Sequence, residues 1–195
     1  ETEITELYNT SNGLFTYVPD DNFEQALIDF GYDDVLDDYV LTENISGLTY
    51  IDLCTKDIAD LTGIEDFVSL TNLCCGINQL TTLDLSSNTQ LETLYASDNQ
   101  LTSIDLSNNV NLTSINCGFN DIASLDFSNN PDLTYINCRA NELTFLNVTN
   151  NTLLNELSFG QNQLLNIDVT NNLLLELLYG YYNNDLQTID VSNND

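Results

Sequence analysis

The stretch LETLYASDNQLTSIDLSNNVN, residues 91–111, decides the fold, because the chain repeats its pattern at a period of 21 residues. A leucine opens each unit, an aliphatic residue follows three positions later, and an asparagine comes eight positions after the leucine. The opening leucines are Leu70, Leu91, Leu112, Leu133, Leu154 and Leu175. The matching asparagines are Asn78, Asn99, Asn120, Asn141, Asn162 and Asn183. Repetition at this period indicates a solenoid.

Each unit contains the pattern of a short strand that is buried on one side. In LxxLxC, alternate residues point the same way, which is the period of a strand. One coil cannot bury such an edge alone, so coils stacked about 4.8 Å apart would form a continuous core and a parallel sheet. The recurring asparagine follows the strand, where its amide can satisfy backbone groups of neighbouring turns. The second half, LDLSSN at residues 83–88, predicts another short strand on the opposite side.

The consensus LxxLxCxxNxLxxLDLSxNxx resembles the leucine-rich repeat family in its short, 21-residue bacterial form. The resemblance covers about residues 48–195 and includes a looser first coil, with Lys56 at the asparagine position. Within that coil, IADLTGIEDFVSL at residues 58–70 resembles internalin-like repeats. The resemblance implies a mostly β, right-handed solenoid of about seven coils. It would carry a parallel sheet on one face and short strands and turns on the other.

Residues 1–47 do not repeat, and they predict a small helical cap over the first open coil of the solenoid. Asp21 as N-cap and Glu24 fit a capping box. Hydrophobic residues from Phe23 onward then follow at helical spacing. We expect a second short helix near residues 34–39.

The segment YVPDDNFEQALIDFGYDDVLDDYVLTENI, residues 17–45, resembles the cap that precedes such repeats in surface proteins of gliding and marine Bacteroidetes. In that family a C-terminal sorting domain for type IX secretion usually follows the array. Here the chain stops inside a repeat motif at Ser192–Asp195, so we expect a fragment of a longer protein. The start, Glu1–Glu6, lacks the charged-then-apolar pattern of a signal segment. We nevertheless expect an extracellular or cell-surface location, with the signal removed or omitted.

The outward strand positions predict a ligand-binding face. From Leu70 on they hold a single carboxylate and the only arginine of the chain. Tyrosine and arginine commonly anchor protein interfaces, and tyrosine also stacks on sugar rings. The candidate residues are Tyr95, Asn116, Tyr135, Asn137, Arg139, Glu156, Tyr179 and Tyr181. The alternative is that tyrosines merely favour strands, and that the cluster at 179–182 covers a further coil.

The five cysteines fall into two groups. Cys75, Cys117 and Cys138 hold the inward position and should be small buried hydrophobic residues. Cys54 and Cys74 point outward on adjacent coils but are offset by two residues. Diagonal neighbours in a sheet lie about 7–8 Å apart, farther than most disulfides allow. We therefore expect five free thiols, and the lack of a CxxC motif also argues against a zinc site.

Acidic residues recur in the LDLS motif and cluster in the cap. The motif column is Asp84, Asp105, Asp126, Asn147, Asp168 and Asp190. We expect these side chains to cap tight turns, with calcium bound by Asp84, Asp105 and Asp126 as the weaker alternative. The cap cluster is Asp33, Asp34, Asp37 and Asp38. It lacks the spacing of an EF-hand, and we expect a solvated helix face there. No other cofactor is expected.

The charge balance excludes several classes of function. The chain has 31 Asp and Glu against 2 Lys and Arg, no His, and a net charge of −29. A polyanion repels nucleic acids and anionic membrane surfaces, and no apolar run approaches the roughly 20 residues of a membrane span. Without histidine there is no Ser-His-Asp triad or histidine zinc site. The repeat face also lacks the pair of carboxylates that a glycosidase needs.

These features predict a non-catalytic recognition module that binds a protein partner on the outward face of the sheet. The first alternative is a glycan-binding or adhesion module of a cell-surface protein. The second is a structural spacer that presents a neighbouring domain. Fold alone does not choose among them. Twelve of the 31 acidic residues lie in residues 1–47, so the acidity resembles a solubility coat more than a recognition surface. The oligomeric state is left open.

Overall fold

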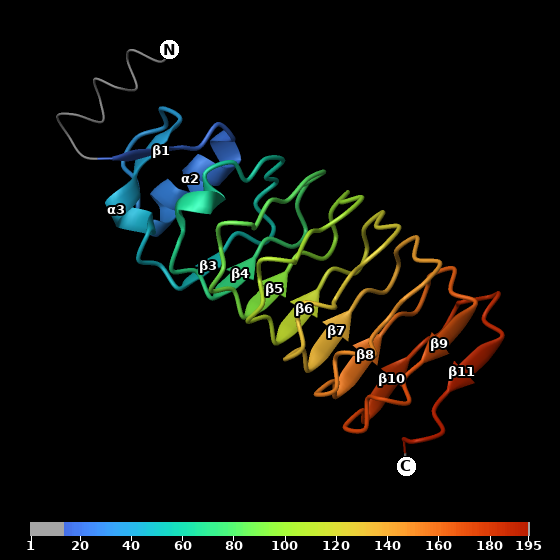
Figure 1. Cartoon of the computed structure of the whole chain (residues 1–195). Helices are drawn as coiled ribbons and strands as arrows, with labels where there is room; N and C mark the ends of the chain where they lie inside the picture. Colours follow the sequence, from blue (N-terminus) through green and yellow to red (C-terminus); the bar gives the residue numbers. More distant parts are fainter. Residues whose placement is uncertain (1–13, 195) are drawn as a thin grey trace.

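The computed structural model describes residues 14–194, which form one elongated stack of coils beneath a small cap (Figure 1). The expected leucine-rich-repeat solenoid, mostly β and with few helices, is confirmed. The acidic start at Glu1–Glu6 and the terminal Asp195 lie outside the described residues.

The principal sheet has seven parallel strands, one from each coil. They are β3 (Tyr50–Asp52), β4 (Asn72–Cys74), β5 (Thr93–Tyr95), β6 (Ser114–Asn116), β7 (Tyr135–Asn137), β8 (Glu156–Ser158) and β10 (Leu177–Tyr179). Equivalent repeat positions pair directly, as Leu94 does with Ile115 and Ile115 with Ile136. The register therefore follows the 21-residue repeat, and each outward position forms a straight column across the sheet.

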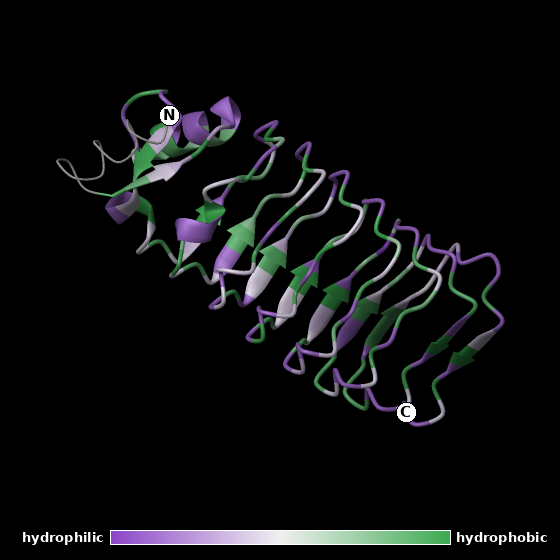
Figure 2. Cartoon of the chain, turned by 45° about the horizontal axis from the view of Figure 1, so that its top comes forward, coloured by the Kyte–Doolittle hydropathy of each residue, from purple (hydrophilic) through white to green (hydrophobic). Residues whose placement is uncertain are grey.

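The core is the stack of inward side chains. The middle residue of each strand from β3 to β8 is buried, and so are the leucines that open most coils. Figure 2 shows this alternation as hydrophobic positions on the strands and hydrophilic residues at the outer turns. The inward cysteines Cys75, Cys117 and Cys138 are fully buried and free. Burial raises the pKa of the Cys75 and Cys117 thiols to about 12, so all three act as small hydrophobic residues.

The second strand expected in every coil forms only near the C-terminal end. There, β9 (Asn166–Asp168) pairs in parallel with β11 (Thr188–Asp190). In the earlier described coils the LDL segments are not strands, so the prediction of a strand in each coil was wrong. Most inward side chains of these segments are buried all the same, with Leu125 partly buried, so side-chain burial does not require backbone pairing here.

The asparagines that follow the strands form a first asparagine row with paired amides. The Asn120 side-chain nitrogen lies 3.0 Å from the Ala96 carbonyl and 3.1 Å from the Cys117 carbonyl. Its oxygen accepts from the Leu101 amide at 3.0 Å. The residue just before each of these asparagines is in the left-handed region, although none is glycine. These residues are Ile77, Asp98, Phe119, Ala140, Gln161 and Tyr182.

A second asparagine row ends the LDLSxN segments. It consists of Asn88, Asn109, Asn130, Asn151, Asn172 and Asn194. Their side-chain nitrogens donate to carbonyls of the preceding coil, as Asn130 does to Leu106 and Asn109. Their side-chain oxygens are buried and accept no hydrogen bond. The two rows thus hold adjacent coils together at two places in the cross-section.

The cap contains two helices and a two-stranded antiparallel sheet. Its elements are β1 (Phe15–Tyr17), α2 (Asp21–Phe30), β2 (Tyr39–Leu41) and α3 (Thr42–Ile45), and a 3-10 helix, η1 (Ile64–Asp66), follows in the first coil. The expected helix near residues 34–39 is absent. That segment forms bends that lead into β2, because β2 pairs with β1.

The expected capping box of helix α2 was also wrong. The N-cap is Asp20, whose Oδ1 accepts from the Asn22 and Phe23 amides. Its other oxygen accepts from the Ala59 and Asp60 amides, so one carboxylate ties the helix to the first coil. Glu24 is buried and accepts instead from the amides of Asp37 and Tyr39.

Within residues 14–194, no helix combines the length and apolarity needed to cross a membrane.

Candidate binding face

The outward side chains of β4–β8 and β10, together with the residues that follow each strand, are called the sheet face here. All eight predicted site residues lie on it. They are Tyr95 on β5, Asn116 on β6, Tyr135 and Asn137 on β7, Glu156 on β8, Tyr179 on β10, and Arg139 and Tyr181 just past their strands. Tyr95, Tyr179 and Tyr181 are each 42% exposed, so they are available for contact.

Tyr135 lies at the centre of this face, half-buried among its neighbours. It pairs in register with Glu156 on the next strand. Burial raises the pKa of Tyr135, and the nearby Glu156 carboxylate and Tyr95 hydroxyl raise it further, against a hydrogen bond to Asn137 that lowers it. Tyr95, Tyr135 and Glu156 therefore belong to one interacting group.

The two asparagines of the face hold the chain where it leaves the sheet. The Asn116 side-chain oxygen accepts from the Gly118 amide, and that of Asn137 accepts from the Arg139 amide, each at 3.2 Å. Their side-chain oxygens thus shape the turns that carry Gly118 and Arg139. We attribute a positioning role to these oxygens, because they are already engaged within the protein.

Arg139 packs against aromatic rings from other coils. Its guanidinium carbon lies 4.5 Å from the centre of the Phe119 ring and 5.8 Å from that of Tyr181. The Tyr181 ring meets the Tyr182 ring edge-on, with 5.4 Å between centres. Sequence reasoning grouped Arg139 with tyrosines of its own face but did not foresee Phe119 as its nearest aromatic partner. The left-handed backbone of Phe119, which no local residue preference signals, sets that residue's position.

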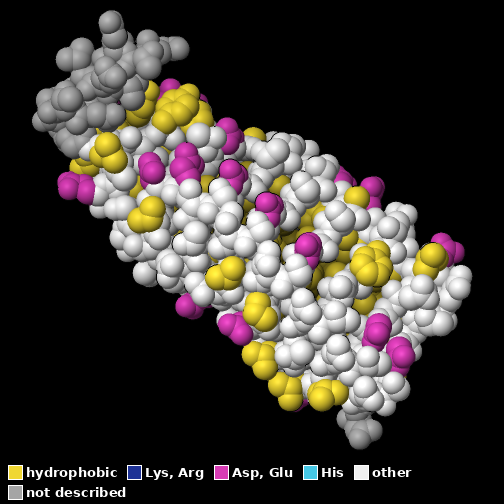
Figure 3. All heavy atoms as spheres, viewed as in Figure 1, with side chains coloured by type: hydrophobic (Ala, Val, Ile, Leu, Met, Phe, Trp, Pro, Cys, Tyr) yellow, Lys and Arg dark blue, Asp and Glu magenta, His cyan; other side chains and the backbone are white. Residues whose placement is uncertain are grey.

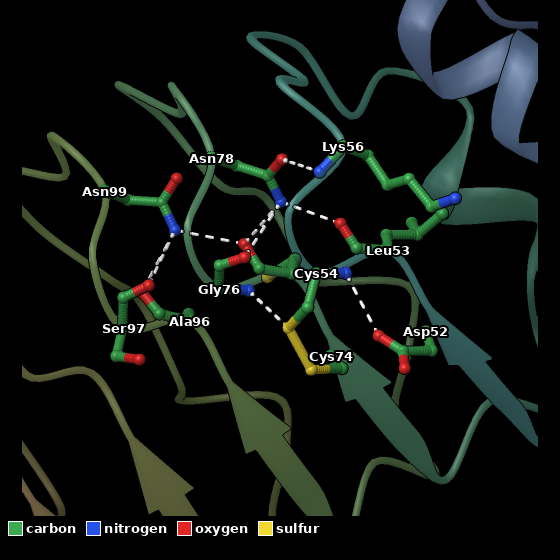
Figure 4. Close-up of a disulfide and its surroundings, with 11 residues drawn as sticks. Asp52, Leu53, Cys54, Lys56, Cys74, Gly76, Asn78, Ala96, Ser97 and Asn99 are labelled. Carbon is green, nitrogen blue, oxygen red and sulfur yellow. Dashed lines mark hydrogen bonds between the residues drawn. A yellow bond between two sulfur atoms is a disulfide. The ribbon is translucent and has the colours of Figure 1, made fainter.

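The structure corrects the prediction of five free thiols. Cys54 and Cys74 form a disulfide with their Cα atoms 5.4 Å apart (Figure 4). The expected diagonal spacing applies within a strand, but β3 ends at Asp52. The Asp52 carboxylate accepts from the Cys54 amide and Thr55 is left-handed, so the chain turns and brings Cys54 beside Cys74.

The disulfide also accounts for the cluster of potential metal ligands found among the described residues. Ligand atoms of Asp52, Cys54 and Cys74 lie within 4.8 Å of one another. The two sulfur atoms are bonded to each other, which leaves the carboxylate as the ligand of this group.

The motif carboxylates occupy the opposite side of the solenoid and cap turns. The Asp84 oxygen accepts from the Ser86 amide at 2.9 Å, and Asp105 and Asp126 make the same contact with Ser107 and Ser128. Hydrogen bonds from the Ser86 backbone and hydroxyl lower the pKa of Asp84. Figure 3 shows acidic side chains in a line along the molecule, with hydrophobic side chains visible in the depression beside it.

Two hollows lie between coils on this opposite side. Their volumes are about 350 and 430 Å³, and both are lined by Thr82, Asp84 and Ser86. They are polar gaps where the LDL segments are not paired as strands, and they do not include any predicted residue of the sheet face.

Known proteins share this architecture. Residues 89–129 match the family described as Leucine Rich repeats (2 copies). Over 73 residues the chain is 41% identical to Internalin J of Listeria monocytogenes serotype 4b (strain F2365). That match spans 37% of this chain and 8% of the relative.

Two solved structures illustrate the likeness of fold. Internalin C2 of Listeria monocytogenes is 18% identical with a TM-score of 0.66, over 91% of this chain and 89% of that one. The leucine-rich repeat ectodomain of the plant membrane receptor kinase GASSHO1/SCHENGEN3 from Arabidopsis thaliana was solved in complex with CASPARIAN STRIP INTEGRITY FACTOR 2. It is 22% identical with a TM-score of 0.56, over 66% of this chain and 19% of that one. At these identities the likeness shows the fold alone.

Proposed function

We propose that this chain is a non-catalytic recognition module that binds a protein partner on its sheet face. The observation that carries the proposal is the contrast between a chain of net charge −29 and a face with exposed tyrosines, one arginine and few carboxylates. Aromatic residues and arginine dominate the binding energy of protein interfaces, whereas acidic residues are depleted there. The plant receptor ectodomain in complex with another factor offers a precedent for protein binding by this fold.

The same proposal places the protein outside the cytosol, on a cell surface or in the surrounding medium. The Cys54–Cys74 disulfide supports this location, because disulfides persist mainly in oxidising compartments. The cap sequence supports the further proposal that the chain comes from a bacterial surface protein of the Bacteroidetes type.

The experiment begins with a photoreactive residue placed at Thr93 on the sheet face or at Ser124 on the opposite side. Each protein is crosslinked to surface proteins of the source cells. A partner captured only from Thr93 is then titrated calorimetrically against the wild type and against the Tyr95→Ala/Tyr135→Ala variant. We expect affinity to fall by about 30-fold or more, the effect of losing interface hot spots of about 2 kcal/mol.

Phe145→Ala is the matched control, because Phe145 is 69% exposed and lies in the segment between two strands of the sheet. It should leave affinity unchanged. Equal affinity of the tyrosine double variant, with its fold intact by circular dichroism, would refute the protein-binding face. If no protein is captured and the wild-type protein instead binds a neutral glycan on an array, the adhesion alternative would be favoured.

A further inference from the structure

The Arg139 side chain is held in place from both sides. Phe119 comes from the preceding coil and Tyr181 from two coils later, and their ring centres lie 4.5 and 5.8 Å from the guanidinium carbon. Aromatic faces attract a guanidinium and favour parallel stacking with its plane. Contacts from two directions restrict the rotamers of a side chain that would otherwise be long and mobile.

Glycines on alternate coils make room for this arrangement. A Cβ atom on Gly118 would lie 3.2 Å from Arg139 Cγ and 3.1 Å from the Arg139 carbonyl oxygen. A Cβ atom on Gly160 would lie 3.3 Å from Tyr181 Cδ1 and 3.0 Å from the Tyr181 carbonyl oxygen. Side chains at these two positions would crowd Arg139 and Tyr181, so the two glycines allow both residues to pack closely where the chain leaves the strands.

The guanidinium donors of Arg139 have no partner within the described part of the chain. No carboxylate of residues 14–194 forms an ion pair with it, although the chain contains 31 acidic residues. Its Nε is buried without a hydrogen bond. The two terminal nitrogens make no hydrogen bond either, and they reach solvent, since only Nε is among the buried unpaired atoms. The two terminal guanidinium nitrogens are therefore free to donate hydrogen bonds to a ligand.

We propose that Arg139, clamped by Phe119 and Tyr181, binds the carboxylate of an Asp or Glu side chain presented by the protein partner. The inference rests on the proposed function of the sheet face and identifies the chemistry at one position of it. A guanidinium forms short, charge-assisted, two-point hydrogen bonds with a carboxylate. The two rings lie beside the guanidinium, and its terminal nitrogens reach solvent, where one carboxylate can accept from both.

The overall charge restricts the kind of segment that can bind. A partner rich in acidic residues would be repelled by a chain of net charge −29. A single carboxylate flanked by apolar residues avoids most of this repulsion, because charges beyond about 8 Å are screened at physiological ionic strength. Its apolar neighbours would pack on the exposed rings of Tyr179 and Tyr181. The expected ligand is thus a peptide segment with one isolated acidic residue.

The test uses a displayed library of random 12-residue peptides, selected on the whole protein and depleted on Arg139→Gln. Each selected peptide is made with its acidic residue and with the corresponding amide, and both are titrated against both proteins. We expect the amide to bind the wild type about 10- to 100-fold more weakly, consistent with the loss of a charged hydrogen bond. Arg139→Gln should lose as much for the acidic peptide, and the combined change should cost no more than either alone.

Phe119→Leu provides a second variant that keeps the arginine but removes the ring beside it, and it should weaken the acidic peptide by a smaller factor. Equal binding of acid and amide peptides to the wild type would overturn the inference. If the wild type bound both peptides equally and the Tyr95→Ala/Tyr135→Ala variant bound neither, the result would support the protein-binding face and contradict the role of Arg139. Arg139-dependent binding of oligogalacturonate, with no peptide selected, would overturn the assignment of the carboxylate to a protein.

Discussion

The two asparagine rows lie in the same coils and use the same side chain in different ways. In the first row, Asn120 donates to two carbonyls at 3.0 and 3.1 Å and its oxygen accepts from the Leu101 amide. In the second row, Asn130 donates to two carbonyls of the coil before it, and its oxygen is buried without a partner. Only the first row uses both the donors and the acceptor of the amide.

This difference shows which row determines the backbone. The first row links each coil to the preceding one from both sides of the amide, since the side-chain nitrogen donates to carbonyls of both coils and the oxygen accepts from an amide of the preceding coil. Such a network can hold Ile77 in a left-handed conformation that β-branched residues rarely adopt. The second row ties coils together through donors alone, so each asparagine of this row keeps a buried side-chain oxygen without a hydrogen bond, which opposes stability.

The largest expected effect follows removal of a first-row amide. Asn120→Ala leaves the buried Leu101 amide without an acceptor and removes the hydrogen bonds to the Ala96, Cys117 and Gly118 carbonyls, of which the first two are the shorter. We expect the free energy of unfolding to fall by about 3–5 kcal/mol, from about 1–3 for the unpaired amide and roughly 1 for each of the two shorter lost bonds. Urea unfolding followed by circular dichroism measures this. A loss no larger than that of Asn130→Ala would contradict the distinction between the rows.

The Cys54–Cys74 disulfide adds a covalent link at the start of the first row. It closes a loop with a sequence separation of 20, for which chain entropy gives a stabilisation of about 3 kcal/mol. Reductant should lower the unfolding midpoint of the wild type and leave that of Cys54→Ser/Cys74→Ser unchanged. Thiol labelling of unreduced, unfolded protein should find three free thiols, those of Cys75, Cys117 and Cys138. Five labelled thiols would show that the bond does not form.

Removal of a second-row amide should cost less. In Asn130→Ala, both carbonyl acceptors keep another donor, because Leu106 O accepts from the Asn109 amide and Asn109 O from the Leu112 amide. The substitution also removes an unpaired oxygen. We expect a loss of about 1–2 kcal/mol from two weakened contacts and a small void. Because Asn120→Ala deletes the same atoms, the difference between the two unfolding energies isolates the hydrogen bonding of the rows.

The smallest effect is expected beside the second row, at the motif carboxylates. Asn147 already replaces aspartate in one coil and still accepts from the Thr149 amide. Asp105→Asn should therefore keep its contact with Ser107 and leave the melting temperature unchanged. Melts with calcium and with chelator should coincide. A calcium-induced rise that Asp105→Asn abolishes would instead assign the column a metal.

The cap shows where sequence patterns were insufficient. Asp20 and Asp21 are both good N-caps, and local preference does not choose between them. Asp20 is the N-cap in the folded chain because its second oxygen also meets the amides of Ala59 and Asp60, which are remote in sequence. The acidic segment before Tyr39 has no helix for a similar reason, since strand β2 pairs with β1.

The sheet face was predictable in its columns but not in its contacts. Register at 21 residues places Tyr135 opposite Glu156 without knowledge of the structure. The clamp of Arg139 by Phe119 depends on a left-handed turn and on Gly118, whose lack of a side chain leaves space for the arginine stem. Neither feature has a signal within a single repeat.

The sequence by itself determined the solenoid, because a leucine period of 21 residues buries its apolar edge only when equivalent positions stack. It also determined which residues point outward, since a strand alternates its faces. The tertiary structure alone decided the Cys54–Cys74 bond, the left-handed turns and the aromatic clamp on Arg139. Each of these depends on where the chain turns after its strand, and contacts with neighbouring coils fix that turn.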